Sequence, residues 1–263
     1  MITHDLLTGW RIAFVFAASI VFGALMLRAM FALAHSRLHD DWVKIFGGAA
    51  RATWLLPLAW LPLMHGGGSV LRGIAYFGLL LIAGTRRVPE AAGLIALVFA
   101  GSAAACDWLA QHSAVFGLRW CVNGLLGAAA LAVVLVDSDL RARVDGANLL
   151  FALSLGWLYL LFCDEITAWS GNLPEEIAPY QTGVTAMTIL AVVHAAVAAI
   201  LLVRRVKRSR TLLAAIAAVL LIAQWFEACV SLQAKPLGIA FAAAITVAVG
   251  MGFWLRRWRT AHA

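Results

Sequence analysis

The chain has 263 residues, of which 63% are hydrophobic and only 13% are charged, and its formal net charge is +7 at pH 7. A soluble domain carries about 25% charged residues, so this composition excludes an ordinary soluble fold. Apolar runs of roughly 20 residues recur along the chain, and each is long enough to cross a hydrocarbon core of ~30 Å. We therefore expect an all-α polytopic membrane protein, with residues 1–263 in a single transmembrane domain and no signal peptide.

Nine transmembrane spans are predicted, separated by three sharp polar breaks and by weaker ones. The sharp breaks are HGGGS at 65–69, DSDLRARVDG at 137–146 and RRVKRSR at 204–210. The predicted spans, in chain order, are 10–34, 43–64, 68–85, 90–110, 114–136, 147–169, 180–203, 211–231 and 237–255.

The basic residues give an independent test of this span count. With the N-terminus outside, most of the 20 Lys and Arg fall on the cytoplasmic side, as the positive-inside rule requires. These cytoplasmic residues are Arg28, Arg37, Lys44, Arg86, Arg87, Arg141, Arg143, Arg204, Arg205, Lys207, Arg208, Arg210, Arg256, Arg257 and Arg259. The others are Arg11, Arg51, Arg72, Arg119 and Lys235. We predict an N-out, C-in topology and attribute the positive net charge to it rather than to nucleic-acid binding.

The histidine and cysteine pattern does not indicate a cofactor site. A b-type haem needs axial ligands that face each other inside the bilayer, whereas only His194 lies deep within a span. The cysteines lie one per apolar segment without a C-x-x-C pair, so we expect no metal, no redox centre and no catalytic residue in this chain. We expect four tryptophans to be interfacial anchors or packing aromatics: Trp60, Trp108, Trp157 and Trp169.

Ionisable residues within the spans are the stronger candidates, because a charge in hydrocarbon is costly and usually faces a cavity or a partner. The candidates for a proton path are Asp107, Asp164, Glu165, His194, Glu227 and Arg119. All lie toward the predicted outer side except His194, which lies near mid-depth. If spans four, six and eight pack together, their carboxylates can converge and continue through His194 as a proton half-channel. Interfacial or structural contacts and contact with a quinol headgroup are the open alternatives.

The segment SGNLPEEIAPY after the sixth span is longer than a turn requires. Pro174 suits the first position of a helix, and Glu175 and Glu176 suit its positively charged first turn. Asn172 can cap that helix. We therefore predict a short interfacial segment on the outer face over residues 170–180.

The same segment resembles a known family. WSGNLPEEIAPY, followed by VVHAAVAAILLVRRVKRSRTLL, is similar to the NLPEE loop and the next helix of the F-type membrane subunit of alternative complex III. GWRIAFVFAASIVFGALMLRAMFALA, GGAARATWLLPLAWLPLM and AAACDWLAQHSAVF resemble other segments of that subunit in the same order. The resemblance covers nearly the whole chain, and the NLPEE loop is its most specific part.

The chain also departs from the family pattern. The family's extra N-terminal helix is missing, which fits an outside N-terminus. The Pro-His-Trp after the D-W motif is replaced near Val115 and Phe116, and Cys163 and Asp164 stand where the family has a polar Ser-Gln pair. These differences indicate a shortened branch of the family.

The resemblance implies an NrfD-like helical bundle in the bacterial inner (cytoplasmic) membrane, within a respiratory complex. Such complexes oxidise quinol and pass electrons to a cytochrome c or to a terminal oxidase. Haem c and iron–sulfur clusters lie in partner subunits, and a sibling NrfD-like membrane subunit holds the clearer quinol site. This chain would supply structural support and a proton half-channel, and would dock its partners through Asn172, Pro174, Glu175 and Glu176.

Two other function classes stay open from the sequence. A standalone transporter would use the acidic cluster as its substrate site, although no Gly/Pro-broken helix recurs in two halves of the chain. A pure assembly scaffold would take no part in transport.

Overall fold

The computed structural model describes residues 2–35, 42, 46, 53–63, 67–84, 88–109, 113–136, 139–171 and 174–261. Every regular element in these ranges is a helix, and they contain no strand. The elements are α1 (Ile2–Leu33), α3 (Leu56–Trp60), the 3-10 turn η1 (Leu61–Leu63), α4 (Gly67–Gly84), α5 (Glu90–Leu109), α6 (Ala114–Leu135), α7 (Leu140–Gly171), α8 (Pro174–Leu201), α9 (Arg204–Arg208), α10 (Arg210–Ser231) and α11 (Pro236–Ala261).

Within the described residues, six helical segments are long and apolar enough to cross a membrane: His4–Leu33, Glu90–Leu109, Ala114–Leu135, Leu140–Gly171, Val184–Leu201 and Arg210–Ser231. Two shorter apolar segments are Val70–Ala83 and Pro236–Val249. The protein is therefore an all-α, multi-pass membrane protein, as its composition predicted. Of the expected span at 43–64, the structure describes residue 46 and residues 53–63, and over 53–63 it has only the short α3 and the turn η1. The rest of that expected span lies outside the described residues.

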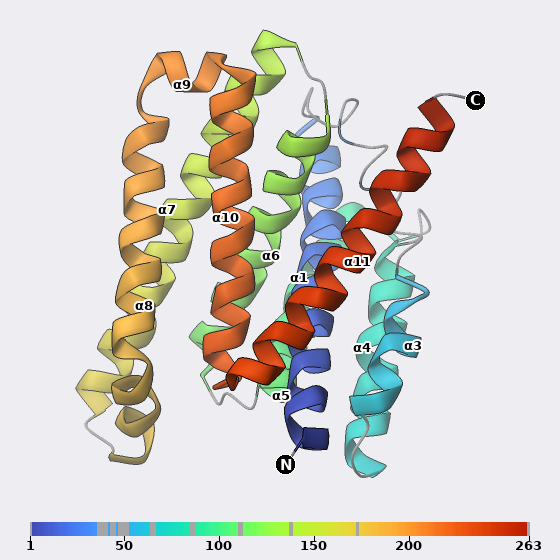
Figure 1. The fold of residues 1–263 in the computed structure, drawn as a ribbon, viewed down its shortest axis with the longest axis vertical. Helices are drawn as coiled ribbons and strands as arrows, with labels where there is room; N and C mark the ends of the chain where they lie inside the picture. The colour runs from blue at the N-terminus through green and yellow to red at the C-terminus, as the bar shows by residue number, and fades with distance from the viewer. Residues whose placement is uncertain are drawn as a thin grey trace.

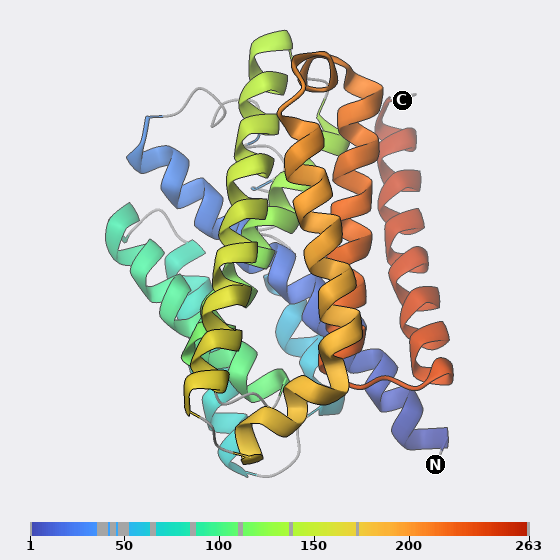
Figure 2. The same ribbon diagram turned by 90° about the vertical axis from the view of Figure 1, so that its left-hand side faces the viewer.

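The helices form one bundle with the two termini at opposite ends (Figure 1). We call the end where α1 begins, lower in Figure 1, the N-terminal face, and the opposite end the C-terminal face. The oblique α1 packs against α5, α6 and α11, and α6 packs in turn against α7 and α10 (Figure 2). The short α9 connects α8 to α10 at the C-terminal face. Helix α6 is thus central to the bundle.

Small residues allow α1 and α6 to cross at close range. A Cβ atom added to Gly23 would overlap the backbone of Gly124, and one added to Gly124 would lie 2.5 Å from the Ser19 carbonyl oxygen. Side chains larger than hydrogen would therefore force the two backbones apart. Glycine at helix crossings is a common solution in membranes, where packing rather than the hydrophobic effect holds helices together. Gly127 likewise lets α10 pack close to α6, because a Cβ atom at this position would overlap the Gln224 side chain.

Local sequence signals define several helix ends near the N-terminal face. Ser113 has extended backbone angles, and its Oγ accepts a hydrogen bond of 3.2 Å from the Phe116 amide, so it caps α6. Helix α8 begins at Pro174, where the missing amide hydrogen is not needed. The first turns of α8 lie at an angle to the rest of the helix (Figure 2), and Pro179 explains the bend because proline removes a helical hydrogen bond.

Candidate functional site

Three helices bring buried ionisable side chains together. Arg119 on α6 lies between Glu227 on α10 and Asp164 on α7. Its Nη1 is 2.8 Å from Glu227 Oε1, and its Nη2 is 3.6 Å from Asp164 Oδ2. The three side chains are 3%, 8% and 2% exposed, so these ion pairs lie inside the bundle. We call these three residues the Arg119 cluster.

The cluster lies toward the N-terminal face because of where its members stand along their helices. Arg119 follows the start of α6 by about one and a half turns, whereas Asp164 and Glu227 precede the ends of their helices by about two turns and one turn. Helix α6 runs opposite to α7 and α10 (Figure 1), so these positions reach similar depth. The helix directions predicted from the sequence therefore put the three groups at similar depth, and the packing of α6 against α7 and α10 brings them together.

Glu227 is the most fully bonded member of the cluster. Besides the bond from Arg119, its Oε2 accepts hydrogen bonds from Asn123 Nδ2 at 2.8 Å and from Trp157 Nε1 at 3.0 Å. Asn123 follows Arg119 by four residues, a spacing that puts both side chains on one helix face. The Glu227 carboxylate is thus held by donors from both α6 and α7.

Asp164 connects the cluster to the end of the bundle. Its Oδ1 accepts a hydrogen bond of 2.7 Å from Ser113 Oγ. Ser113 is only partly buried and lies immediately before α6, where its Oγ also caps the helix. A hydroxyl group can both donate and accept, so Ser113 can relay a proton between solvent at the N-terminal face and Asp164.

His194 on α8 lies next to the cluster without bonding to it directly. Its ring stacks on the Trp157 indole with centroids 4.1 Å apart and planes inclined by 12°. Trp157 therefore donates to Glu227 through Nε1 while its face covers His194. His194 is 1% exposed, and neither of its ring nitrogens has a hydrogen-bond partner in the described part of the chain. An imidazole with both nitrogens unbonded can accept or donate a proton once water or a neighbour reaches it.

The charges of the cluster do not cancel. One guanidinium faces two carboxylates, so the site carries a charge of −1 when all three groups are ionised. Isolated charge is costly in a low-dielectric interior, and one proton would make the site neutral. Arginine does not give up its proton, so the exchangeable positions are the two carboxylates.

A small cavity adjoins Glu227. It has a volume of about 10 Å³, which is near the lower limit for one water molecule, and Ser19, Asn123 and Gln224 line it. Gln224 Nε2 donates to Ser19 Oγ at 2.9 Å, but Gln224 Oε1 and Asn123 Oδ1 have no partner among the described residues. Two unbonded acceptors beside a carboxylate favour a hydrogen-bonding guest such as water.

Toward the C-terminal face, the packing beyond this site is apolar apart from the buried hydroxyl of Ser154, which has no hydrogen-bond partner in the described part of the chain. Tightly packed side chains such as Leu126, Leu150, Leu213 and Leu220 fill the space between α6, α7 and α10. Among the described buried residues, the acidic, basic and histidine side chains are Asp5, Arg119, Asp164, His194 and Glu227. No other acidic, basic or histidine side chain in the described ranges is buried and continues the series beyond His194.

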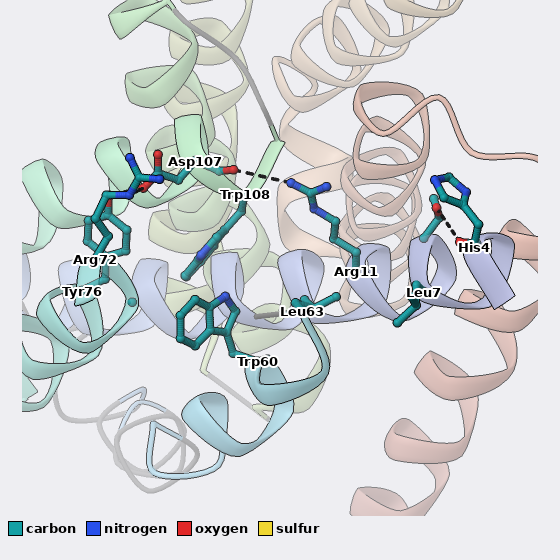
Figure 3. Close-up of a pocket in the computed structure, with 11 residues that line it drawn as sticks. His4, Leu7, Arg11, Trp60, Leu63, Arg72, Tyr76, Asp107 and Trp108 are labelled. Atoms are coloured by element: carbon teal, nitrogen blue, oxygen red, sulfur yellow. Dashed lines mark hydrogen bonds and ion pairs between the residues drawn. The ribbon is translucent and has the colours of Figure 1, made fainter. Parts of the chain in front are cut away.

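The remaining candidates predicted from the sequence lie apart from the Arg119 cluster. Asp107 pairs with Arg72 at 3.1 Å and accepts a hydrogen bond from Tyr76 at 2.5 Å (Figure 3), which corrects the expected grouping. The reason is packing, since α5 contacts α1, α4 and α6 and makes no comparable contact with α7 or α10. Glu165 is exposed on α7.

The residues expected to dock partners are only partly described. Asn172 lies outside the described residues. For Pro174, Glu175 and Glu176 the structure describes the helix but not the side chains.

Sequence reasoning missed several partners of the candidates. Trp157 was expected to be an anchor or packing aromatic, yet it is fully buried and bonds Glu227. Their spacing in the sequence could have identified them. Asn123 is four residues from Arg119 and Trp157 is seven residues from Asp164, and both intervals put the two side chains on the same face of a helix. No comparable signal pointed to Ser113.

The comparisons with known proteins identify no relative. A scan against models of protein families found no match, and a search of curated proteins found none either. The part of the chain that the structure describes contains no group of three or more His, Cys, Asp or Glu side chains that could hold a metal ion.

Proposed function

We propose that this chain is a membrane subunit of a respiratory quinol-oxidising complex of the alternative complex III type, in which the Arg119 cluster forms part of a proton half-channel. The observation that carries the proton role is the convergence of Arg119, Asp164 and Glu227 inside the bundle, with His194 adjacent. The type of complex rests on the resemblance of the NLPEE loop and the segments around it.

The proposed route starts at the N-terminal face and ends at His194. Ser113 passes a proton to Asp164, and the Asp164 carboxylate exchanges it with Glu227 around the fixed positive charge of Arg119. His194 does not line the cavity beside Glu227, so a water molecule that reaches the unbonded ring nitrogens of His194 would have to complete the exchange. Because the packing beyond is apolar, waters entering by fluctuation or a neighbouring subunit must carry protons further.

The proposed topology has nine spans, with the N-terminal face outside and the C-terminal face in the cytoplasm. Eight apolar helices are described, six of them long and two shorter, and the ninth span would include residues 43–64. Basic side chains support this orientation, because Arg141 and Arg143 begin α7 at the C-terminal face beside α9, itself the basic sequence RRVKR.

The proposed partners are a sibling NrfD-like subunit and the haem c and iron–sulfur subunits on the outer side, in a bacterial cytoplasmic membrane. The NLPEE segment would contact an outer subunit, since α8 begins at the N-terminal face. Complexes purified with Asn172→Ala or Glu175→Gln are expected to lose outer subunits, as measured by haem staining of native gels. Full subunit content and electron-transfer rate in both variants would refute the docking role. A chain that purifies alone, without any c-type cytochrome, would favour a transporter.

The proton role is tested in liposomes that contain the intact complex. Quinol-driven electron transfer and proton release are measured for wild type, Asp164→Asn, Glu227→Gln and His194→Ala. Glu165→Gln is the matched control, because it removes a carboxylate adjacent in sequence but exposed. We expect a lower proton-to-electron ratio in the three variants and an unchanged ratio in the control. Unchanged ratios in all four would leave the Arg119 cluster with a structural role only.

A further inference from the structure

A second polar site lies at the N-terminal face, separate from the Arg119 cluster. It is a pocket of about 390 Å³ between α1, α3, α4 and the end of α5. Figure 3 shows Arg11 of α1 and Arg72 of α4 on either side of Asp107, with Trp60 and Trp108 beside them. This volume falls in the range of about 300–1,000 Å³ that is typical of small-ligand sites.

Of the two arginines in the pocket, Arg72 has a carboxylate counter-ion and Arg11 has none among the described residues. Arg72 forms an ion pair with Asp107 at 3.1 Å, and Tyr76 also donates to that carboxylate. Arg11 makes one long hydrogen bond, from Nη2 to the Asp107 carbonyl oxygen at 3.5 Å, and no carboxylate in the described ranges pairs with it. The guanidinium has five N–H donors, so most of the hydrogen-bonding capacity of Arg11 is unused. The pocket therefore contains one positive charge without a counter-ion from the described chain.

A third donor in the pocket also lacks an acceptor. Trp108 is 5% exposed, and its Nε1 has no hydrogen-bond partner in the described part of the protein. A buried N–H without an acceptor costs roughly 1–3 kcal/mol, and native structures rarely keep such groups unless a ligand or water accepts from them. Arg11 and Trp108 thus both have N–H groups that a bound acceptor could satisfy, and the positive charge of Arg11 favours an acceptor that is negatively charged.

The apolar side of the pocket is formed by two tightly packed tryptophans, Trp60 and Trp108. Trp60 is 4% exposed, and its ring lies against Gly73, where an added Cβ would overlap the indole. Trp60 and Trp108 both pack on Phe77, with ring centroids 5.6 and 6.0 Å away. Rigid aromatic walls beside unneutralised donors suit an amphipathic molecule with an anionic head.

We propose that this pocket binds a phosphate group, with Arg11 as its principal ligand and Trp108 and Arg72 as supporting donors. Phosphate matches the guanidinium because two of its oxygens can accept parallel N–H bonds. Asp107 lies within one turn of the end of α5, at the level where the headgroups of a bilayer would lie. The phosphate of an anionic lipid is thus the nearest source, and inorganic phosphate offers the same chemistry. This site does not depend on the proposed respiratory role.

The test uses the purified full chain in detergent and measures binding by native mass spectrometry. Three probes are titrated: dioleoylphosphatidylglycerol, dioleoylglycerol, which lacks the phosphate, and sodium phosphate. The variants are Arg11→Gln and Arg11→Lys, which keeps the charge but loses the planar fork. Lys235→Gln is the control, because it removes a positive charge from the same face outside the pocket.

We expect wild type and Lys235→Gln to bind phosphatidylglycerol alike and to bind dioleoylglycerol much more weakly. Arg11→Gln should lose at least about tenfold in affinity for phosphatidylglycerol, and Arg11→Lys should fall between. If sodium phosphate binds alone with the same dependence on Arg11, the phosphate chemistry stands and its source is the solution. Equal affinity of wild type and Arg11→Gln, or equal binding of both lipids, would overturn the proposal.

A second variant protects the test against misfolding. Thr8 lines the pocket, and its hydroxyl bonds only the His4 carbonyl oxygen of its own helix. Thr8→Glu adds a carboxylate beside Arg11 without removing any buried group, so it should abolish phosphatidylglycerol binding by neutralising Arg11 and repelling phosphate. Retained affinity in Thr8→Glu would refute the proposal even if Arg11→Gln does not fold.

Discussion

Replacing Arg119 with glutamine tests how strongly the buried ion pairs hold the bundle together. The change removes the guanidinium that lies 2.8 Å from Glu227 and 3.6 Å from Asp164, and it leaves two carboxylates 2–8% exposed without a cation. At an effective dielectric constant of roughly 20, unit charges at these distances attract each other by about 5–6 kcal/mol per pair. The loss of arginine also removes its own desolvation cost. We therefore expect the free energy of unfolding to fall by about 3–5 kcal/mol, the usual result of breaking a buried ion pair.

The assay is reversible unfolding of the full chain in mixed micelles, followed by tryptophan fluorescence as denaturing detergent is added. Arg141→Gln is the control, because Arg141 is exposed at the C-terminal face and should change stability by less than about 0.5 kcal/mol. Double-mutant cycles then pair Arg119→Gln with Glu227→Gln or with Asp164→Asn. The coupling energy should be larger for Glu227, because its oxygen is closer. A destabilisation below about 1 kcal/mol for Arg119→Gln, or a coupling energy near zero in both cycles, would refute this reasoning.

Three further predictions follow from the packing and the topology. Trp157→Phe should keep a ring over His194 but lose the hydrogen bond to Glu227, and so lower the free energy of unfolding by about 1.5–3 kcal/mol. In the same unfolding assay the control Trp169→Phe, which changes an indole that is 77% exposed, should have little effect. Gly124→Val should lower stability by about 1–3 kcal/mol or more, because its Cβ meets the α1 backbone; equal unfolding midpoints for this variant and wild type would contradict the close crossing. In a background without the native cysteines, single cysteines at 172–176 should react with an impermeant reagent from outside, and those at 204–210 should not; the reverse pattern would invert the proposed topology.

Much of the fold follows from the sequence because a bilayer leaves a chain few choices. Backbone groups in hydrocarbon must bond internally, so an apolar run of sufficient length becomes a helix whatever its neighbours are. The expected helix at 114–136 is therefore α6 (Ala114–Leu135), and the expected 211–231 is α10 (Arg210–Ser231). The depth of Asp164 and Glu227 along their helices was predictable for the same reason, since rise per residue is constant.

The sequence by itself therefore determined the class, most helix positions and the depth of Arg119, Asp164 and Glu227, because these depend on the period and length of apolar runs. Only the tertiary structure decided which helices touch, and with that which charges meet. Asp107 has nearly the depth of Asp164 but faces α1 and α4, so it pairs with Arg72 instead of Arg119. That choice depends on contacts between residues far apart in the chain, such as the crossing of Gly23 with Gly124, which no local pattern specifies.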